Sequence, residues 1–394
     1  MKSLPVKILT AILTFTIGVV VAGMWLKSSS VDPVIVPVTG PVQTHTASKL
    51  EMVFVLDTTG SMGGLLDGAK QRIWGIVNDV MQQSHSSVKI GLVAYRDHGD
   101  DYITQVLPLT EDLDKVYSTL MDYQAAGGGD GPEDVRAALA DGLYKAGWSH
   151  FSNDLAQVIF LVGDAPPHND YRNEQDTEIT ARQAVKKGIF VNTIQCGNSV
   201  ETANAWQVIA ESGHGEYFMI PADGGVQAID TPYDQKLGEL ANKLGATFVP
   251  YGFAGEADAE AKRAAVATRA EAIETRVALG AGSMAKAERA INKVANSEAY
   301  VGDLLQSVEN GTVKVENLDT ASLPQEWQAM LPAERQQEIE RRLALRREIR
   351  EQISSLSKQR TEYIAAEQKK SGTKDAGFDV VVSRAVLKQM KRMQ

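Results

Sequence analysis

Residues 52–62 read MVFVLDTTGSM, and this stretch holds the clearest structural signal in the chain. A run of five apolar residues, Met52–Leu56, is followed at once by Asp57, and hydroxyl side chains stand at Thr59 and Ser61. Short continuous apolar runs are typical of strands buried on both faces of a parallel sheet. A carboxylate and two hydroxyls at alternate positions after the strand can all face one point. The stretch therefore predicts a buried strand whose carboxyl end carries oxygen ligands.

Further apolar runs of the same kind follow, separated by longer segments with helical spacing. This alternation predicts an α/β fold, in which a doubly wound, mostly parallel, Rossmann-like sheet carries helices on both faces. A site in such a sheet is expected at the carboxyl ends of the strands. The other expected strands are Val88–Tyr95, Leu155–Val162 and Ile189–Ile194, and the expected helices are Leu65–Gln83, Glu133–Ala146, Asp176–Lys187 and Glu201–Glu211.

The charge of the chain is unevenly distributed. Of its 394 residues 23% are charged, and the formal net charge is −10. Residues 50–250 hold 28 acidic and 13 basic residues, whereas residues 251–394 hold 21 and 23. Such acidity excludes a general affinity for nucleic acid. The single cysteine, Cys196, stands in an apolar run, which is typical of a small core residue and not of a redox site.

The first 27 residues contain a candidate membrane segment. Ile8–Leu26 is a run of 19 uncharged residues that follows Lys2 and Lys7. Its length predicts a transmembrane anchor, and the preceding lysines place the body of the protein outside the cytoplasm, as on the periplasmic side of a bacterial inner membrane. A signal peptide that is cleaved before secretion is the alternative. Residues 28–48 are rich in Pro and Ser and predict an extended linker.

The composition changes again after residue 252. Residues 49–252 form the expected sheet domain, and residues 253–394 are expected to be helical, with a long coiled-coil-like helix over residues 332–370. The apolar stripe of that helix predicts an antiparallel helical hairpin or a two-stranded coiled coil, which would allow self-association. A single helix stabilised by Glu/Arg pairs is the alternative. The stripe comprises Ile339, Leu343, Ile349, Ile353, Leu356, Tyr363 and Ile364.

The sheet domain resembles a von Willebrand factor A (vWA) domain with its metal-ion-dependent adhesion site (MIDAS). The D-x-[S/T]-x-S motif of that family matches Asp57, Thr59 and Ser61, and Asp164 follows a later buried run where the family has Thr-Asp-Gly. The likeness extends from residue 49 to about residue 250. It implies direct or water-mediated contacts from these four residues to Mg²⁺, or to Mn²⁺ or Ca²⁺.

One loop departs from the family pattern. Most members have a threonine before a helix, where residues 127–134 of this chain read GGGDGPED. Glu133 is in register with that threonine, and Asp130 is the acid of the glycine loop. Either carboxylate is a candidate fifth metal ligand, and the sequence leaves both open. An anionic ligand would weaken the pull of the ion on an incoming carboxylate.

A second acidic loop lies at the same expected edge of the sheet. Residues 96–101 read RDHGDD and carry three carboxylates and His98. The loop allows either a second cation site or an ordinary solvated acidic surface. His168, four residues beyond Asp164, is expected to form a hydrogen bond at this rim more readily than to bind a metal.

These observations predict a non-enzymatic, metal-dependent protein-binding module of the adhesion or scaffold type, exposed outside the cytoplasm. The carboxylate of a protein partner would complete the coordination sphere of Mg²⁺. No nucleophile and base stand close together in the sequence. The alternative is a metal-dependent, phosphoesterase-like hydrolase on the same acidic edge, which would require two ions about 3.5 to 4 Å apart.

Overall fold

A computed structural model describes residues 49–84, 87–129, 131–222, 229–295, 302–371 and 378–392. The expected membrane segment, the expected linker and Asp130 lie outside the described residues. Among the residues that are described, no helix combines the length and the apolar character needed to cross a bilayer.

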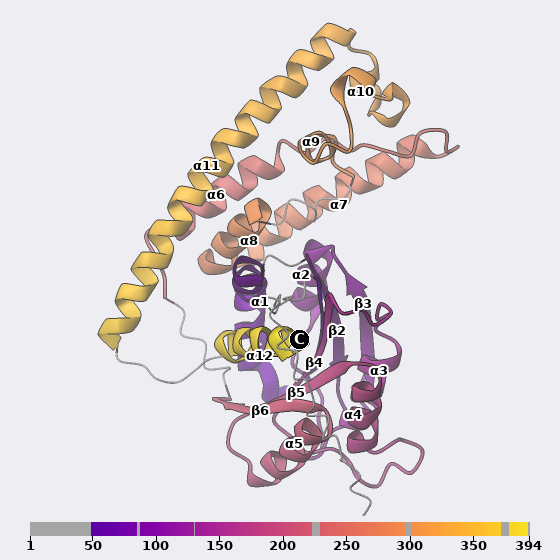
Figure 1. Ribbon diagram of the computed structural model, residues 1–394, viewed down its shortest axis with the longest axis vertical. Coiled ribbons are helices and arrows are strands. Elements are labelled where there is room, and N and C mark those ends of the chain that lie inside the picture. Colours follow the sequence, from indigo (N-terminus) through magenta and orange to yellow (C-terminus); the bar gives the residue numbers. More distant parts are fainter. Residues whose placement is uncertain are drawn as a thin grey trace, which may run out of the picture. The chain divides into compact units, whose positions relative to one another are not determined.

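The described residues contain a six-stranded sheet with the order β3-β2-β1-β4-β5-β6 (Figure 1). All neighbouring strands are parallel except β2 and β3, which are antiparallel. The doubly wound, mostly parallel α/β fold predicted from the sequence is confirmed. The strands are β1 (Lys49–Asp57), β2 (Ser87–Tyr95), β3 (Thr104–Thr110), β4 (Leu155–Gly163), β5 (Ile189–Cys196) and β6 (His214–Ile220).

The two strands that the sequence did not predict, β3 and β6, are the edges of the sheet. Their residues are largely half-buried or exposed, whereas every residue of β4 is buried. An edge strand therefore lacks the continuous apolar run that identifies a central strand.

Helices cover both faces of the sheet, and β1 contributes to both cores. Phe54 and Leu56 pack on one face, and Val53 and Val55 pack on the other. The first face is covered by α1 (Gly63–Ser84), α2 (Leu113–Asp122) and α12 (Phe378–Arg392), and the second by α3 (Val135–Tyr144), α4 (Thr177–Lys186) and α5 (Val200–Ser212).

The last helix, α12, belongs to the core of the sheet domain. Figure 1 shows it beside α1, although the two lie at opposite ends of the described chain. The Phe378 ring lies 6.0 Å from that of Phe54, which stacks on Phe160 at 5.4 Å. The structure thus differs from the expected division at residue 252 in this element, because an apolar helical stripe does not reveal which surface it packs against.

The helices between β6 and α12 form a further layer with its own small cores, although α7 (Ala259–Gly280) also packs Ile273 and Val277 against the core of the sheet. The long helix α11 buries Ile349 and Ile353 against α6 and α8, and Ile339 packs near Leu304 and Trp327. Other helices of the same chain therefore cover much of the stripe for which a hairpin or coiled-coil partner was predicted. These helices are α6 (Asp234–Gly245), α7 (Ala259–Gly280), α8 (Ser283–Ala295), α9 (Leu304–Glu309), α10 (Gln325–Gln328) and α11 (Pro332–Ser371).

Polar contacts join this helical layer to the sheet domain. The Arg289 side chain of α8 is 2% exposed and pairs with Asp114 of α2 at 2.8 Å and with Glu274 of α7 at 2.9 Å. The Asn78 amide of α1 donates to the backbone oxygen of Glu288 at 2.9 Å. Moving the helical layer away from the sheet domain would leave these buried charges without their partners, which costs free energy.

Candidate metal centre

The carboxyl ends of β1 and β4 meet where the strand order reverses, which is where α/β sheets bind ligands. Asp57 is the last residue of β1 and is fully buried, and Asp164 directly follows β4. Asp57 Oδ1 accepts hydrogen bonds from the Thr59 backbone N–H at 2.9 Å and from the Thr59 hydroxyl at 2.7 Å. Thr59 Oγ1 lies 3.4 Å from Ser61 Oγ. The turn thereby gathers a carboxylate and two hydroxyls in the arrangement that the sequence motif suggested.

Close approach of the two strands requires a glycine before Asp164. A Cβ atom at Gly163 would lie 2.4 Å from the Tyr95 hydroxyl and 3.1 Å from Asp57 Oδ2. Any side chain at this position would displace the Asp57 carboxylate or the tyrosine.

Glu133 stands outside the helix that was expected to begin with it. The helix α3 begins at Val135 and is capped by Asp134, whose Oδ1 accepts the Ala137 N–H at 2.9 Å. Glu133 instead pairs with the loop after β4, donating its N–H to the Pro166 oxygen at 3.0 Å. The expected start of this helix was therefore wrong by two residues, because Glu133 is fixed by a long-range pairing.

The Glu133 carboxylate faces the turn after β1. A Cβ atom at Gly128 would lie 2.9 Å from Glu133 Oε1 and 3.1 Å from the Thr59 Cβ, and Gly128 has a positive φ of 74°. Of the two carboxylates that the sequence left open, Glu133 is thus placed at the site, and Asp130 lies outside the described residues.

Four of the expected ligands line one pocket of about 400 Å³: Thr59, Ser61, Glu133 and Asp164. Its wall also includes the first turn of α5, a helix that the sequence predicted without linking it to the site. There Ser199 accepts the Thr202 N–H at 3.3 Å, and the Thr202 hydroxyl donates to the Asp164 backbone oxygen at 2.9 Å. A serine cap following the strand beside β4 was the available signal.

The electrostatics of this pocket favour a cation. Burial, supplemented by the charge of Asp164, raises the pKa of Asp57 to about 7. Burial, together with the charges of Asp57 and other nearby acids, raises the pKa of Glu133 to about 9. Asp57 Oδ2 and Glu133 Oε2 are buried and have no hydrogen-bond partner among the described residues. Carboxylate and hydroxyl oxygens in this setting fit a hard divalent ion such as Mg²⁺, Mn²⁺ or Ca²⁺.

The acidic side chains of the 96–101 loop form hydrogen bonds with different partners. Asp97 accepts a hydrogen bond from the Tyr171 hydroxyl at 2.7 Å and lies 3.4 Å from His168 Nε2. Asp100 accepts the Gly128 N–H at 3.0 Å, so this loop supports the glycine loop of the pocket. His168 contacts carboxylates at the rim, in keeping with the hydrogen-bonding role expected for it.

Sequence comparison agrees with the fold. A family model described as von Willebrand factor A domain matches residues 51–232. The chain contains a vWA domain. The von Willebrand factor A domain-containing protein 7 of Rattus norvegicus is 26% identical over 192 residues, which are 49% of this chain and 20% of that protein. The Homo sapiens protein of the same name is 29% identical over 138 residues, which are 35% and 14%.

A solved structure of proximal thread matrix protein 1 from the mussel byssus, described as having a zinc-occupied MIDAS motif, also matches the chain. It has 13% sequence identity and a TM-score of 0.35, and the match covers 46% of this chain and 43% of that one. The chain spans only 20% and 14% of the lengths of the two curated relatives above.

Proposed function

We propose that this chain is a metal-dependent protein-binding module. In this proposal Asp57, Thr59, Ser61, Glu133 and Asp164 hold Mg²⁺, with Mn²⁺ or Ca²⁺ as alternatives, directly or through water. The observation that carries the proposal is the convergence of these five side chains, from three separate segments, at the carboxyl ends of β1 and β4. vWA domains are typically protein-interaction modules without enzymatic activity, which agrees with this role.

The bound ion would supply a positive charge whose open coordination position accepts the Asp or Glu carboxylate of a protein partner. The residues of this chain prepare that position. Asp57 fixes the Thr59 hydroxyl, and Asp164 is held through its backbone oxygen by Thr202. The N-terminal turn of α5 also lines the pocket, and the partial positive charge of a helix N-terminus favours an anionic partner.

Exposure outside the cytoplasm is a further part of the proposal, supported by the apolar segment Ile8–Leu26 and the lysines before it. Protease added to intact spheroplasts tests the exposure, because it degrades only a body that lies outside the cytoplasm, and alkaline extraction of the membranes distinguishes an anchor from a cleaved signal peptide. A membrane-anchored protein stays in the pellet after extraction, whereas a protein released after signal cleavage appears in the soluble fraction.

Partner capture tests the metal-bridged interaction. The immobilised full chain is incubated with membrane extract in Mg²⁺ and, separately, in EDTA. The Asp57→Ala and Asp101→Asn variants are incubated with the same extract in Mg²⁺. Asp101 is an exposed acid of the neighbouring loop and serves as the matched control. We expect a set of proteins that the unaltered chain and Asp101→Asn retain, and that EDTA and Asp57→Ala both release. Retention of the same proteins by Asp57→Ala would contradict the proposal.

A further inference from the structure

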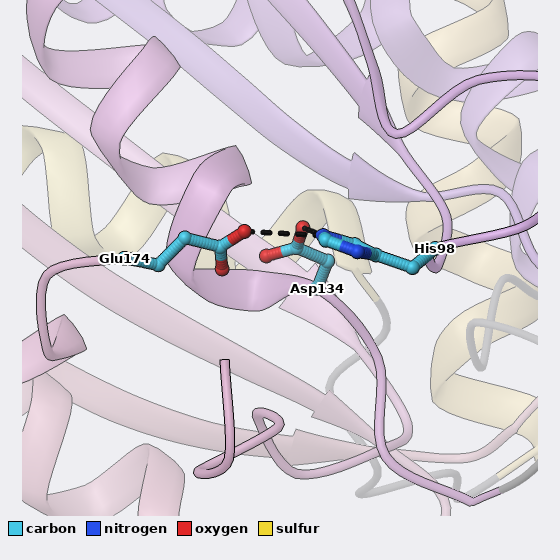
Figure 2. Close-up of side chains that lie close together, drawn as sticks. All are labelled: His98, Asp134 and Glu174. Carbon is cyan, nitrogen blue, oxygen red and sulfur yellow. Dashed lines mark hydrogen bonds and ion pairs between the residues drawn. The ribbon is translucent and has the colours of Figure 1, made fainter. Parts of the chain in front are cut away.

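A second group of ligand-type side chains lies next to Glu133 in the chain. It consists of His98 from the loop after β2, Asp134 at the start of α3, and Glu174 from the loop before α4 (Figure 2). His98 Nε2 lies 3.1 Å from Asp134 Oδ2 and 3.1 Å from Glu174 Oε1. One ligand atom from each residue lies within 4.8 Å of the other two. Three segments distant in sequence thus bring one nitrogen and two oxygens together.

The buried carboxylate of this cluster has one oxygen available. Asp134 is 0% exposed, and its Oδ1 caps α3 by accepting the Ala137 N–H. Its Oδ2 points at His98 and makes no hydrogen bond of good geometry with any described residue. Glu174 Oε2 is also buried without such a bond within the described part of the chain. A single imidazole N–H cannot satisfy two carboxylates fully, so the cluster holds more acceptors than donors.

The histidine ring is held in place by its neighbours. His98 stacks on Tyr171 with ring centroids 4.1 Å apart, and the Tyr171 hydroxyl donates to Asp97. Ligands whose orientation is fixed before binding are what a specific metal site requires.

We propose that His98, Asp134 and Glu174 bind a transition-metal ion of the Zn²⁺ class. Bonds of about 2.0 to 2.2 Å at tetrahedral angles place adjacent zinc ligands about 3.3 to 3.6 Å apart, so the two 3.1 Å separations need widen only slightly to admit the ion. An imidazole ligand favours Zn²⁺ over Mg²⁺ or Ca²⁺. The His98 side chain is 45% exposed, so the ion has a path of entry and water can occupy its remaining position.

This second site is independent of the proposed function, because no residue belongs to both clusters. Two-metal hydrolases hold their ions about 3.5 to 4 Å apart as a joint clamp, and the absence of a shared ligand among the described residues argues against that use. The ion would instead tie the β2–β3 loop, the start of α3 and the loop before α4 together beside the pocket.

Zinc and cobalt titrations of the full chain in excess Mg²⁺ test the proposal. Calorimetry with Zn²⁺ and visible absorption with Co²⁺ are recorded for the unaltered chain and for His98→Asn, Glu174→Gln and His168→Asn. His168 is the matched control, since it stacks on the same tyrosine but is outside the cluster. We expect His98→Asn and Glu174→Gln to weaken Zn²⁺ binding at least about 10- to 100-fold, and His168→Asn to leave it nearly unchanged.

Thermal unfolding monitored by circular dichroism establishes that each variant is folded. Zn²⁺ should raise the melting temperature of the unaltered chain but not that of His98→Asn. The Asp57→Ala variant should keep the Zn²⁺ site, which separates this proposal from the Mg²⁺ site. Absence of Zn²⁺ binding by the unaltered chain would show that the cluster is only a histidine paired with two carboxylates. Zn²⁺ binding by His98→Asn and Glu174→Gln that equals that of the unaltered chain would also overturn the proposal.

Discussion

Asn192 on β5 and Gln389 on α12 exchange two hydrogen bonds between their side-chain amides, at 3.1 and 2.7 Å, although 197 residues separate them. Both residues are fully buried. Asn192 Oδ1 also accepts the Glu216 N–H from β6 at 2.9 Å, so this amide of β5 links the neighbouring strand and the last helix. The vWA sheet is therefore completed by the final described segment of the chain, and the α6–α11 helices are inserted before it.

This arrangement predicts that α12 is needed for the stability of the sheet domain. Phe378→Ala removes a ring that is 1% exposed and packs near Phe54, and should lower the free energy of unfolding by about 3 to 5 kcal/mol. Val380→Ala, at a side chain that is 43% exposed on the same helix, should cost less than about 0.5 kcal/mol. Urea denaturation of both variants measures the difference. Equal, small effects would mean that α12 is not part of the core.

The absence of a side chain at Gly163 is expected to be necessary for the metal site, because it leaves room for the Asp57 carboxylate. A methyl group at this position would crowd Asp57 Oδ2 and the Tyr95 hydroxyl, so Gly163→Ala should lower the affinity for Mg²⁺ at least about 10-fold. Gly129→Ala is the matched control, because a Cβ atom there meets no atom within 4 Å. Calorimetric titration of both variants tests this. Unchanged affinity in Gly163→Ala would show that Asp57 is not held at the ion by this contact.

The negative charge of Glu133 should raise the affinity of the site for Mg²⁺ and lower the affinity of the bound ion for a partner carboxylate. Glu133→Thr removes one negative charge, so it should weaken Mg²⁺ binding and leave more residual positive charge on the ion. Its metal-loaded form should then retain more of the EDTA-sensitive partner. Glu201→Gln, at an exposed acid of the pocket wall, is the control and should change both properties less. If the two variants behave alike, Glu133 shapes the rim without contacting the ion.

The raised pKa of Asp57 predicts a pH-dependent stability in the absence of metal. The pKa is about 7 in the folded chain and 3.8 ordinarily, so the folded state binds the proton more tightly than the unfolded state. The contribution of Asp57 to stability should therefore decrease as the pH rises from about 4 to about 7. Urea denaturation in EDTA at pH 5 and pH 8 should show a smaller loss for Asp57→Asn than for the unaltered chain. An identical loss would contradict the prediction, and added Mg²⁺ should reduce the loss in the unaltered chain.

The sequence predicted the parts of the site that depend on local order. Asp57, Thr59 and Ser61 lie within five residues at the end of an apolar run, and Asp164 follows another. Their meeting follows from parallel strands that end at one edge of the sheet. Glu133 was one of two candidates, with Asp130, that the register before a helix offered, and that helix begins two residues later than expected.

The parts that were not predicted depend on contacts between distant segments. Glu174 carries no local pattern that connects it to His98, and they meet only because two loops fold over the same end of α3. Likewise, the apolar stripe of α12 shows that one of its faces is buried, and only the tertiary structure identifies Phe54 as the neighbour of Phe378. Periodicity reports how much of an element is buried and not which surface covers it.

Calorimetric titration of Mg²⁺ into the full chain and into Asp57→Ala at pH 8 tests the metal centre most directly. Above the folded pKa of about 7 the Asp57 carboxylate is ionised and available to the ion. We predict that the unaltered chain binds Mg²⁺, and that Asp57→Ala keeps its circular dichroism spectrum while its affinity falls at least about 100-fold. Equal Mg²⁺ binding by the two proteins would contradict the assignment of this site.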